Sequence, residues 1–183
     1  MLIAAGAKNM VLVDRRGIID ENDDLLGEER QALAKITNPE KLTGALTEAI
    51  KNADVFVGVS APNIVSAEMV ASMNSDSILF AMANPVPEIM PDVAKAAGAR
   101  VVGTGRSDFP NQVNNVVAFP GIFKGALEGR APQITEAMKL AAANAIAGLV
   151  PENELNDENI LPEAFNPQVA QVVAEAVKAN ISR

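Results

Sequence analysis

The chain has 183 residues, of which 49% are hydrophobic, and its 15 basic and 23 acidic side chains give a formal net charge of −8. The length suits one domain with a substantial core, whereas the negative charge, without any polybasic run, argues against nucleic acid and anionic membranes as partners. Cysteine, His, Tyr and Trp are absent, which excludes disulfides and thiolate chemistry and leaves Asp, Glu, Lys and water for proton transfer. No signal peptide and no apolar run of about 20 residues is present, so we expect a soluble, cytoplasmic protein.

The start of the sequence predicts the end of a helix and then a strand. Residues 2–7 resemble a last helical turn closed by Gly6, because glycine adopts the left-handed conformation at low cost. Residues 9–13 form a short apolar run that ends at Asp14, as a buried parallel strand does. The polar residues 15–27 are expected to form a loop.

Strands and helices are predicted to alternate through the next hundred residues. Asn38 and Pro39 are a typical N-cap and first-turn proline, and apolar residues at helical spacing follow, which predicts a helix over residues 38–52. Apolar runs and helical periodicity further predict strands at 55–59, 77–81 and 100–103, and helices at 66–72 and 91–97. This alternation predicts an α/β fold, a doubly wound parallel sheet with helices on both faces and ligands at the carboxyl ends of the strands.

Beyond residue 110 the strand pattern stops. Helices are predicted at 113–127, 135–148 and 167–180, where they either cap the sheet or cover a neighbouring subunit. The acidic residues 151–159 predict an exposed loop. We expect one domain over residues 1–183, with alternating strands and helices in 1–110 and mainly helices in 111–183.

Polar residues follow several predicted strands where a parallel sheet binds ligands. Asp14 is placed to accept hydrogen bonds from the ribose of an adenosine cofactor, although a solvated carboxylate that caps a turn explains it equally well. Residues 60–62 and 83–85 follow the next two strands. The Asn84 amide both donates and accepts hydrogen bonds, which suits a carboxylate or carboxamide ligand, but Asn before Pro is also an ordinary turn former.

The segment 104–115 concentrates Gly and polar residues between a strand and an apolar helix, as ligand-binding loops do. Its alternative interpretation is a long polar connection in which Asn114 and Asn115 begin the helix, with Arg106 and Asp108 as an exposed ion pair. The sequence has no Ser-His or Cys-His pair, no regularly spaced metal ligands and no Gly-x-Gly-x-x-Gly phosphate loop. We therefore predict no catalytic and no metal-binding residue in this chain.

Five segments together resemble bacterial malic enzymes, nearly from end to end: AGAKN at 5–9, VDR at 13–15, GVSAP at 58–62, ANP at 83–85 and GTGRSDFPNQVNN at 103–115. The stretch 104–127 is the most specific. The resemblance implies the C-terminal, Rossmann-type NAD(P)-binding domain of an enzyme that oxidises and decarboxylates malate to pyruvate and CO2. That reaction uses NAD or NADP and a divalent metal, Mg or Mn, which acts as a Lewis acid on the enolate oxygen.

The resemblance also implies roles for individual residues. Asp14, with Arg15 beside it, would bind the adenosine ribose, and an acid there favours NAD, whereas Arg15 and Arg16 could accommodate the 2′-phosphate of NADP, so the cofactor choice stays open. The remaining positions would line the cofactor channel or hold the nicotinamide end and malate, and they are Ser60, Ala61, Asn84, Asn114 and Asn115.

The departures from the family pattern predict a fragment. The catalytic Tyr of the family is absent, and its catalytic Lys, metal-binding carboxylates and glycine-rich loop lie upstream of Met1, so the chain alone should be inactive without an N-terminal catalytic half. The first strand of the sheet would also be missing, so we expect residues 10–13 to be displaced or paired with another chain. We further expect a homo-oligomer.

Two other functions remain open. One is a non-catalytic binding or assembly module derived from the same fold, which would bind a related subunit or a carboxylate ligand. The other is a different amino-acid or hydroxy-acid dehydrogenase, which would share the alternation of strands and helices but not the segment 104–115.

Overall fold

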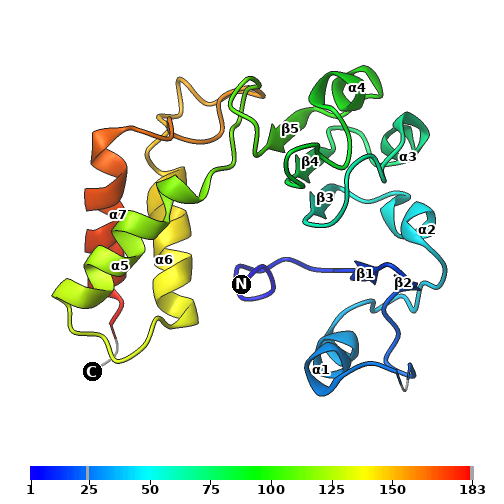
Figure 1. Cartoon of the computed structure of the whole chain (residues 1–183), viewed down its shortest axis with the longest axis horizontal. Helices are drawn as coiled ribbons and strands as arrows, with labels where there is room; N and C mark the ends of the chain where they lie inside the picture. The colour runs from blue at the N-terminus through cyan, green and yellow to red at the C-terminus, as the bar shows by residue number, and fades with distance from the viewer. Residues whose placement is uncertain (24, 182–183) are drawn as a thin grey trace.

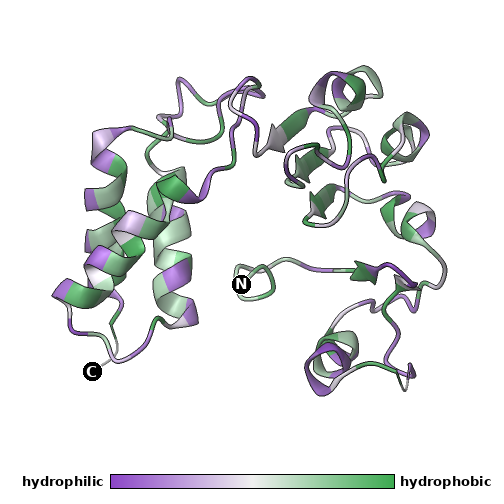
Figure 2. Cartoon of the chain, viewed as in Figure 1, coloured by the Kyte–Doolittle hydropathy of each residue, from purple (hydrophilic) through white to green (hydrophobic). Residues whose placement is uncertain are grey.

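The computed structural model describes residues 1–23 and 25–181. A parallel sheet with its helices and a cluster of three longer helices lie on opposite sides of the view, joined by extended segments (Figure 1). The N-terminal residues run between these two parts. The strands of the sheet are apolar, whereas the segments that leave them carry many hydrophilic residues (Figure 2).

The sheet consists of three short parallel strands in the order β3-β4-β5: Val55–Gly58, Ile78–Ala81 and Val101–Thr104. The register aligns Gly58 with Ala81 and Ala81 with Thr104, so the three carboxyl ends lie side by side. The predicted α/β fold with a parallel sheet is confirmed.

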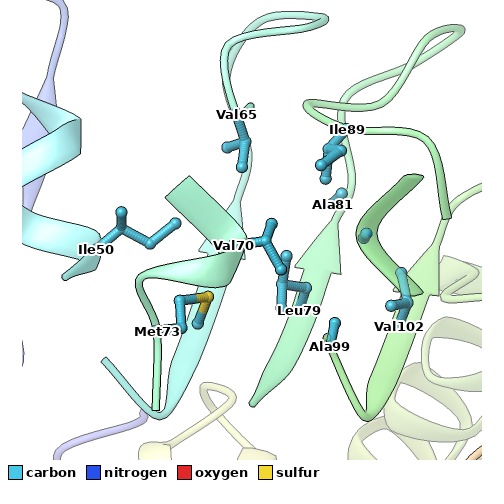
Figure 3. Close-up of a cluster of buried hydrophobic side chains, with 10 residues drawn as sticks. Ile50, Val65, Val70, Met73, Leu79, Ala81, Ile89, Ala99 and Val102 are labelled. Atoms are coloured by element: carbon cyan, nitrogen blue, oxygen red, sulfur yellow. The ribbon is translucent and has the colours of Figure 1, made fainter. Parts of the chain in front are cut away.

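Three short helices follow or precede the strands: α2 at Leu46–Ile50, α3 at Ala67–Ala71 and α4 at Pro91–Ala96. Ser66 caps α3 by accepting a hydrogen bond from the Met69 backbone N–H, and Gly98 adopts a positive φ just after α4. Figure 3 shows the apolar side chains gathered between α3 and the strands. This core consists of Ile50, Val65, Val70, Met73, Leu79, Ala81, Ile89, Ala94, Ala99 and Val102.

The other face of the sheet is less well covered. Side chains alternate between the two faces of a strand, and Val55 and Val57 on β3 point away from this core. Their exposed fractions are 49% and 43%, which is high for valine in a strand. The described helices therefore shield one face of β3 and leave the other largely open.

The C-terminal helices form a core of their own rather than capping the sheet. A short 3-10 helix, η1 at Asn115–Val117, leads into α5 at Phe119–Glu128, and α6 at Glu136–Ala147 and α7 at Pro167–Ala179 follow. The predicted helix 113–127 is thus divided at Ala118. Their shared core consists of Val117, Ala126, Met138, Ala142, Ile146, Val169, Val173 and Val177.

The N-terminal region differs most from the prediction. Residues 1–6 form a turn in which Ala7 donates to the Leu2 carbonyl and Gly6 has a φ of 96°, as expected. The strand predicted at 9–13 is reduced to β1, Val13–Asp14, which pairs antiparallel with β2, Gly17–Ile18, inside the predicted loop. β1 is not part of the three-stranded sheet, which agrees with the expected displacement of this segment.

The predicted helix over residues 38–52 is wrong in its first half. Asn38 has a φ of +50°, whereas an N-cap residue needs an extended conformation, and its side chain instead holds both the N–H and the carbonyl of Leu42. The helix begins at Leu46, where Glu48 accepts a hydrogen bond from the Ala45 N–H. A helix that the sequence did not predict, α1 at Glu28–Ile36, precedes this loop.

Candidate functional site

Two loops at the carboxyl edge of the sheet are fastened to each other. The loop after β3 and the loop after β4 are joined by backbone hydrogen bonds from Met82 to Gly58, from Asn63 to Pro87 and from Val65 to the Glu88 carbonyl, each 3.0 Å long. The two loops therefore stay bonded to each other beyond the ends of the strands. Residues predicted to bind a ligand from either loop are brought to one edge.

A buried carboxylate lies between these two loops. The Glu88 side chain is fully buried, and its Oε1 accepts a hydrogen bond from the Ser60 backbone N–H at 2.8 Å, with the Ser60 Oγ at 3.5 Å. Its Oε2 accepts a hydrogen bond from the Ala83 N–H at 2.9 Å. Sequence reasoning missed Glu88, and its one local signal is an acid placed between two apolar residues, Pro87 and Ile89.

The predicted cofactor residues of these loops are exposed. Ser60, Ala61 and Asn84 all have solvent-accessible side chains at the carboxyl edge. The Ser60 backbone is held by Glu88, whereas the Asn84 amide makes no side-chain hydrogen bond within residues 1–23 and 25–181. Hydroxyl and amide groups that face solvent in this way can donate and accept hydrogen bonds to a bound ligand.

The loop after β5 is held by contacts within the loop and with the end of β5. Val113 donates a backbone hydrogen bond to the Thr104 carbonyl at 2.8 Å, and the Thr104 Oγ1 is buried without a partner in the described structure. Arg106 donates two hydrogen bonds to Asp108, at 2.9 and 2.6 Å, and lies over the Phe109 ring. The hydrogen bonds from Arg106 lower the pKa of Asp108, and both residues form an exposed pair, as one interpretation predicted.

Asn114 and Asn115 start the helical part of the chain. The Asn114 Oδ1 accepts a hydrogen bond from the Val116 N–H at 3.1 Å and thereby caps η1, while Asn115 is exposed. No hydrogen bond in the part of the chain that the structure describes connects either residue to Ser60 or Asn84. The structure thus joins the β3 and β4 loops by hydrogen bonds, whereas it shows no such bond from these loops to Asn114 or Asn115 among the described residues.

Asp14 caps a turn at the end of β1. Its Oδ1 accepts a hydrogen bond from the Arg16 N–H at 2.8 Å, and its Oδ2 accepts one from Arg30 at 3.1 Å. The Arg16 N–H bond is the main cause that lowers the pKa of Asp14, and the charges of the neighbouring arginines add to it. Arg15 beside it is exposed. Because β1 is outside the parallel sheet, Asp14 does not share an edge with Ser60.

The hollows on the surface lie away from the predicted site residues. Two open hollows have volumes of about 470 and 650 Å³. The first is lined by residues within 3–10 and 35–41 and the second by residues of α6 and α7 with Asn180, and no predicted site residue lines either. Among the described residues, no group of three or more carboxylates or other metal-ligating side chains lies close enough together to hold a metal ion. None of the helices that the structure describes combines the length and apolar character that a bilayer span requires.

A parallel sheet with polar loops fastened together at its carboxyl edge is the arrangement of a Rossmann-type nucleotide-binding domain. Comparison with known families specifies the class further. The family model "Malic enzyme, NAD binding domain" matches residues 3–181. The chain therefore belongs to the malic enzyme family, in its NAD-binding domain.

Its relatives are longer proteins. The NAD-dependent malic enzyme of Geobacillus stearothermophilus is 52% identical over 97% of this chain, and the bifunctional malic/malolactic enzyme of Bacillus subtilis is 53% identical over 94%. The crystal structure of the NAD-dependent malic enzyme of Thermotoga maritima superposes with a TM-score of 0.90 at 51% identity over 97% of this chain. The chain spans 37%, 42% and 46% of the lengths of these three proteins, respectively.

Proposed function

We propose that this chain is the cofactor-binding part of a malic enzyme that oxidises and decarboxylates malate to pyruvate and CO2. The observation that carries the proposal is the match of residues 3–181 to the NAD-binding domain of this family. The carboxyl edge adds chemical support, since exposed amide and hydroxyl groups lie where parallel sheets bind nucleotides. Relatives named as NAD-dependent and as NADP-dependent enzymes leave either cofactor open.

The proposed roles follow the position of each residue. Ser60 and Ala61 line the cofactor channel, and Asn84 binds the nicotinamide end with an amide that is free to donate and accept. Asp14 and Arg15 contact the adenosine ribose from the β1–β2 turn. When bound there, NAD or NADP would supply the acceptor for the hydride of malate.

Malate itself is proposed to contact the amides of Asn84, Asn114 and Asn115. The described residues do not fit a metal ion, because they contain no cluster of carboxylates, and no step through Mg or Mn is assigned to them. In the full-length enzyme the metal ligands would lie outside this chain.

We expect the isolated chain not to oxidise or decarboxylate malate in a standard activity assay. It has no Tyr, His or Cys for proton transfer, and it spans less than half the length of the three relatives compared above. The remaining catalytic groups would come from a second part of the enzyme, and the whole assembly would be a cytoplasmic homo-oligomer. Residues 1–183 would form a single domain of it.

Calorimetric titration of the chain with NAD, and separately with NADP, tests cofactor binding. Asp14→Asn should weaken binding by about tenfold if the carboxylate contacts the ribose, which is the usual loss for one charged hydrogen bond. The control is Asp92→Asn, which removes the same charge from an exposed position in the first turn of α4. If the folded chain binds neither nucleotide, or if both variants bind as the wild type does, the proposed ribose site is wrong.

A binding or assembly module is the second candidate function. It is favoured by apolar side chains that remain exposed on the open face of β3 and along one side of α5, namely Val55, Val57, Phe119, Phe123 and Leu127. Analytical ultracentrifugation distinguishes the two functions. A chain that associates with itself but binds no nucleotide would favour the module, whereas nucleotide binding by the folded chain would favour the enzyme domain.

A further inference from the structure

The geometry points to Glu88 as a positioning residue that sets the loops after β3 and β4 at the spacing the cofactor needs. This inference rests on the proposed function, because it names the group that prepares the same carboxyl edge. Glu88 is fully buried, and its side chain accepts hydrogen bonds from Ser60 and Ala83, so it would act on the cofactor through the two loops.

The two oxygens of Glu88 serve different loops. Oε1 accepts from the Ser60 N–H at 2.8 Å and Oε2 accepts from the Ala83 N–H at 2.9 Å. Each donor lies directly beside a proposed cofactor residue, Ala61 in one loop and Asn84 in the other. One rigid carboxylate therefore fixes the distance between the two backbone segments from which the cofactor contacts extend.

Burial makes this arrangement specific. Carboxylates are almost never fully buried unless their oxygens are paired, and Glu88 is the one charged side chain in the buried set of the described residues. It forms no ion pair with any described cation, so backbone N–H groups supply its compensation. Hydrogen bonds to a charged acceptor are stronger than neutral ones, which suits a clamp between loops.

The neighbouring strand leaves room for this carboxylate. A Cβ added at Gly58, the last residue of β3, would lie 2.5 Å from Cδ and 2.7 Å from Oε1 of Glu88. Such distances are far below van der Waals contact, so glycine at position 58 lets the side chain reach Ser60. The sequence thus supplies a small residue on one strand and an acid from the next loop as a matched pair.

The hydrogen bonds can be tested without any cofactor. In wild-type chain, amide hydrogen exchange followed by NMR should be at least about tenfold slower at Ser60 and Ala83 than at Ala61 and Asn84, whose N–H groups have no described partner. Equal exchange at all four amides would overturn the inference, even if no variant could be folded.

The variant Glu88→Gln keeps the shape but replaces one accepting oxygen by an NH2 group. Exchange should then become at least about tenfold faster at either Ser60 or Ala83, because one amide oxygen cannot accept from both loops. The control, Glu152→Gln, changes an exposed acid outside this site and should leave both amides as they are. Unchanged exchange in Glu88→Gln would overturn the inference.

Cofactor affinity links the clamp to function. If the wild-type chain binds NAD or NADP, Glu88→Gln should weaken that binding by about five- to tenfold with a circular dichroism spectrum like that of the control. A folded Glu88→Gln chain with wild-type affinity would show that the clamp does not prepare the cofactor site and would overturn the inference. If the wild type binds no nucleotide, the proposed function fails, and the exchange data alone decide whether Glu88 holds the loops.

Discussion

The contact between α5 and α7 depends on a glycine that allows two helix backbones to approach closely. A Cβ added at Gly125 would lie 2.4 Å from the carbonyl oxygen of Ala174, 3.0 Å from its Cα and 2.9 Å from the Val177 Cβ. Two of these three atoms belong to the backbone of α7, so no rotamer change relieves the clash. In Gly125→Ala the helices would have to separate by about 1 Å to restore ordinary contact.

Two opposing effects determine the magnitude. Alanine in a helix interior is favoured over glycine by about 1 kcal/mol, which alone would stabilise the chain. Overpacking typically costs about 1–3 kcal/mol, and separation by about 1 Å weakens the other α5–α7 contacts by up to about half. We therefore expect an overpacking cost near the upper end of this range, about 3 kcal/mol, from which the helix propensity of alanine subtracts about 1 kcal/mol. The net loss of unfolding free energy is then about 2 kcal/mol, which lowers the Tm by about 4–8 °C in a chain of this size.

Thermal and urea unfolding followed by circular dichroism would measure this loss. The matched control is Gly148→Ala at the end of α6, where the nearest atom that the added Cβ would meet, the Asn144 carbonyl oxygen, is 3.3 Å away. This control should stay within about 0.5 kcal/mol of wild type. A Gly125→Ala chain as stable as wild type, or more stable, would refute the packing argument, because propensity would then outweigh the contact.

Two further predictions concern polar groups. NMR titration should show that the pKa of Asp14 is lowered from its ordinary value of about 4, because the Arg16 N–H stabilises the carboxylate. The contribution of Asp14 to stability is then full above the unfolded pKa and is lost as the pH falls through the folded pKa. A pKa at or above the ordinary value would contradict this reasoning. Asn111→Ala should lower the unfolding free energy by about 2–3 kcal/mol, because the buried side chain donates to the Val102 and Asp157 carbonyls and accepts from the Ile160 N–H. Proteolysis within residues 151–159 should accelerate as well, whereas exposed Asn153→Ala should change neither property.

The sheet and the C-terminal helices were predictable because local and global preferences agree there. The apolar runs at β3, β4 and β5 are bounded by polar, Gly and Pro residues. Ser66 and Thr135, the first residues of the predicted helices 66–72 and 135–148, are the N-caps of α3 and α6 in the structure. Residues 28–45 were not predictable in this way. Asn38 before Pro39 is a typical helix start, yet its left-handed backbone serves a loop, and α1 has too few apolar residues to show a clear helical period.

Part of the candidate site was also predictable from local sequence, whereas another part depends on tertiary structure. The exposed positions of Ser60 and Asn84 follow from the sequence, because residues after parallel strands must meet at one edge. Glu88 could not be found in this way, since its partner Ser60 is 28 residues away and only the register of β3 with β4 brings them together. Its burial is a tertiary property, whereas an acid after a proline is in itself an ordinary loop residue.

The proposed cofactor site is held by hydrogen bonds on one side and is less constrained on the other, which affects the affinity expected for a nucleotide. Glu88 fixes the β3 and β4 loops, whereas the β1–β2 ribbon that carries Asp14 does not pair with the three-stranded sheet. The ribbon contacts the rest of the chain through bonds such as that of the Ile18 N–H to the Gly44 carbonyl and that of Arg30 to Asp14. A nucleotide that contacted both Asp14 and Ser60 would have to fix their relative position, and that ordering subtracts from its binding free energy. Residues that joined the ribbon to β3 would remove this cost, so a longer malic enzyme containing such residues should bind the nucleotide more tightly than this chain alone.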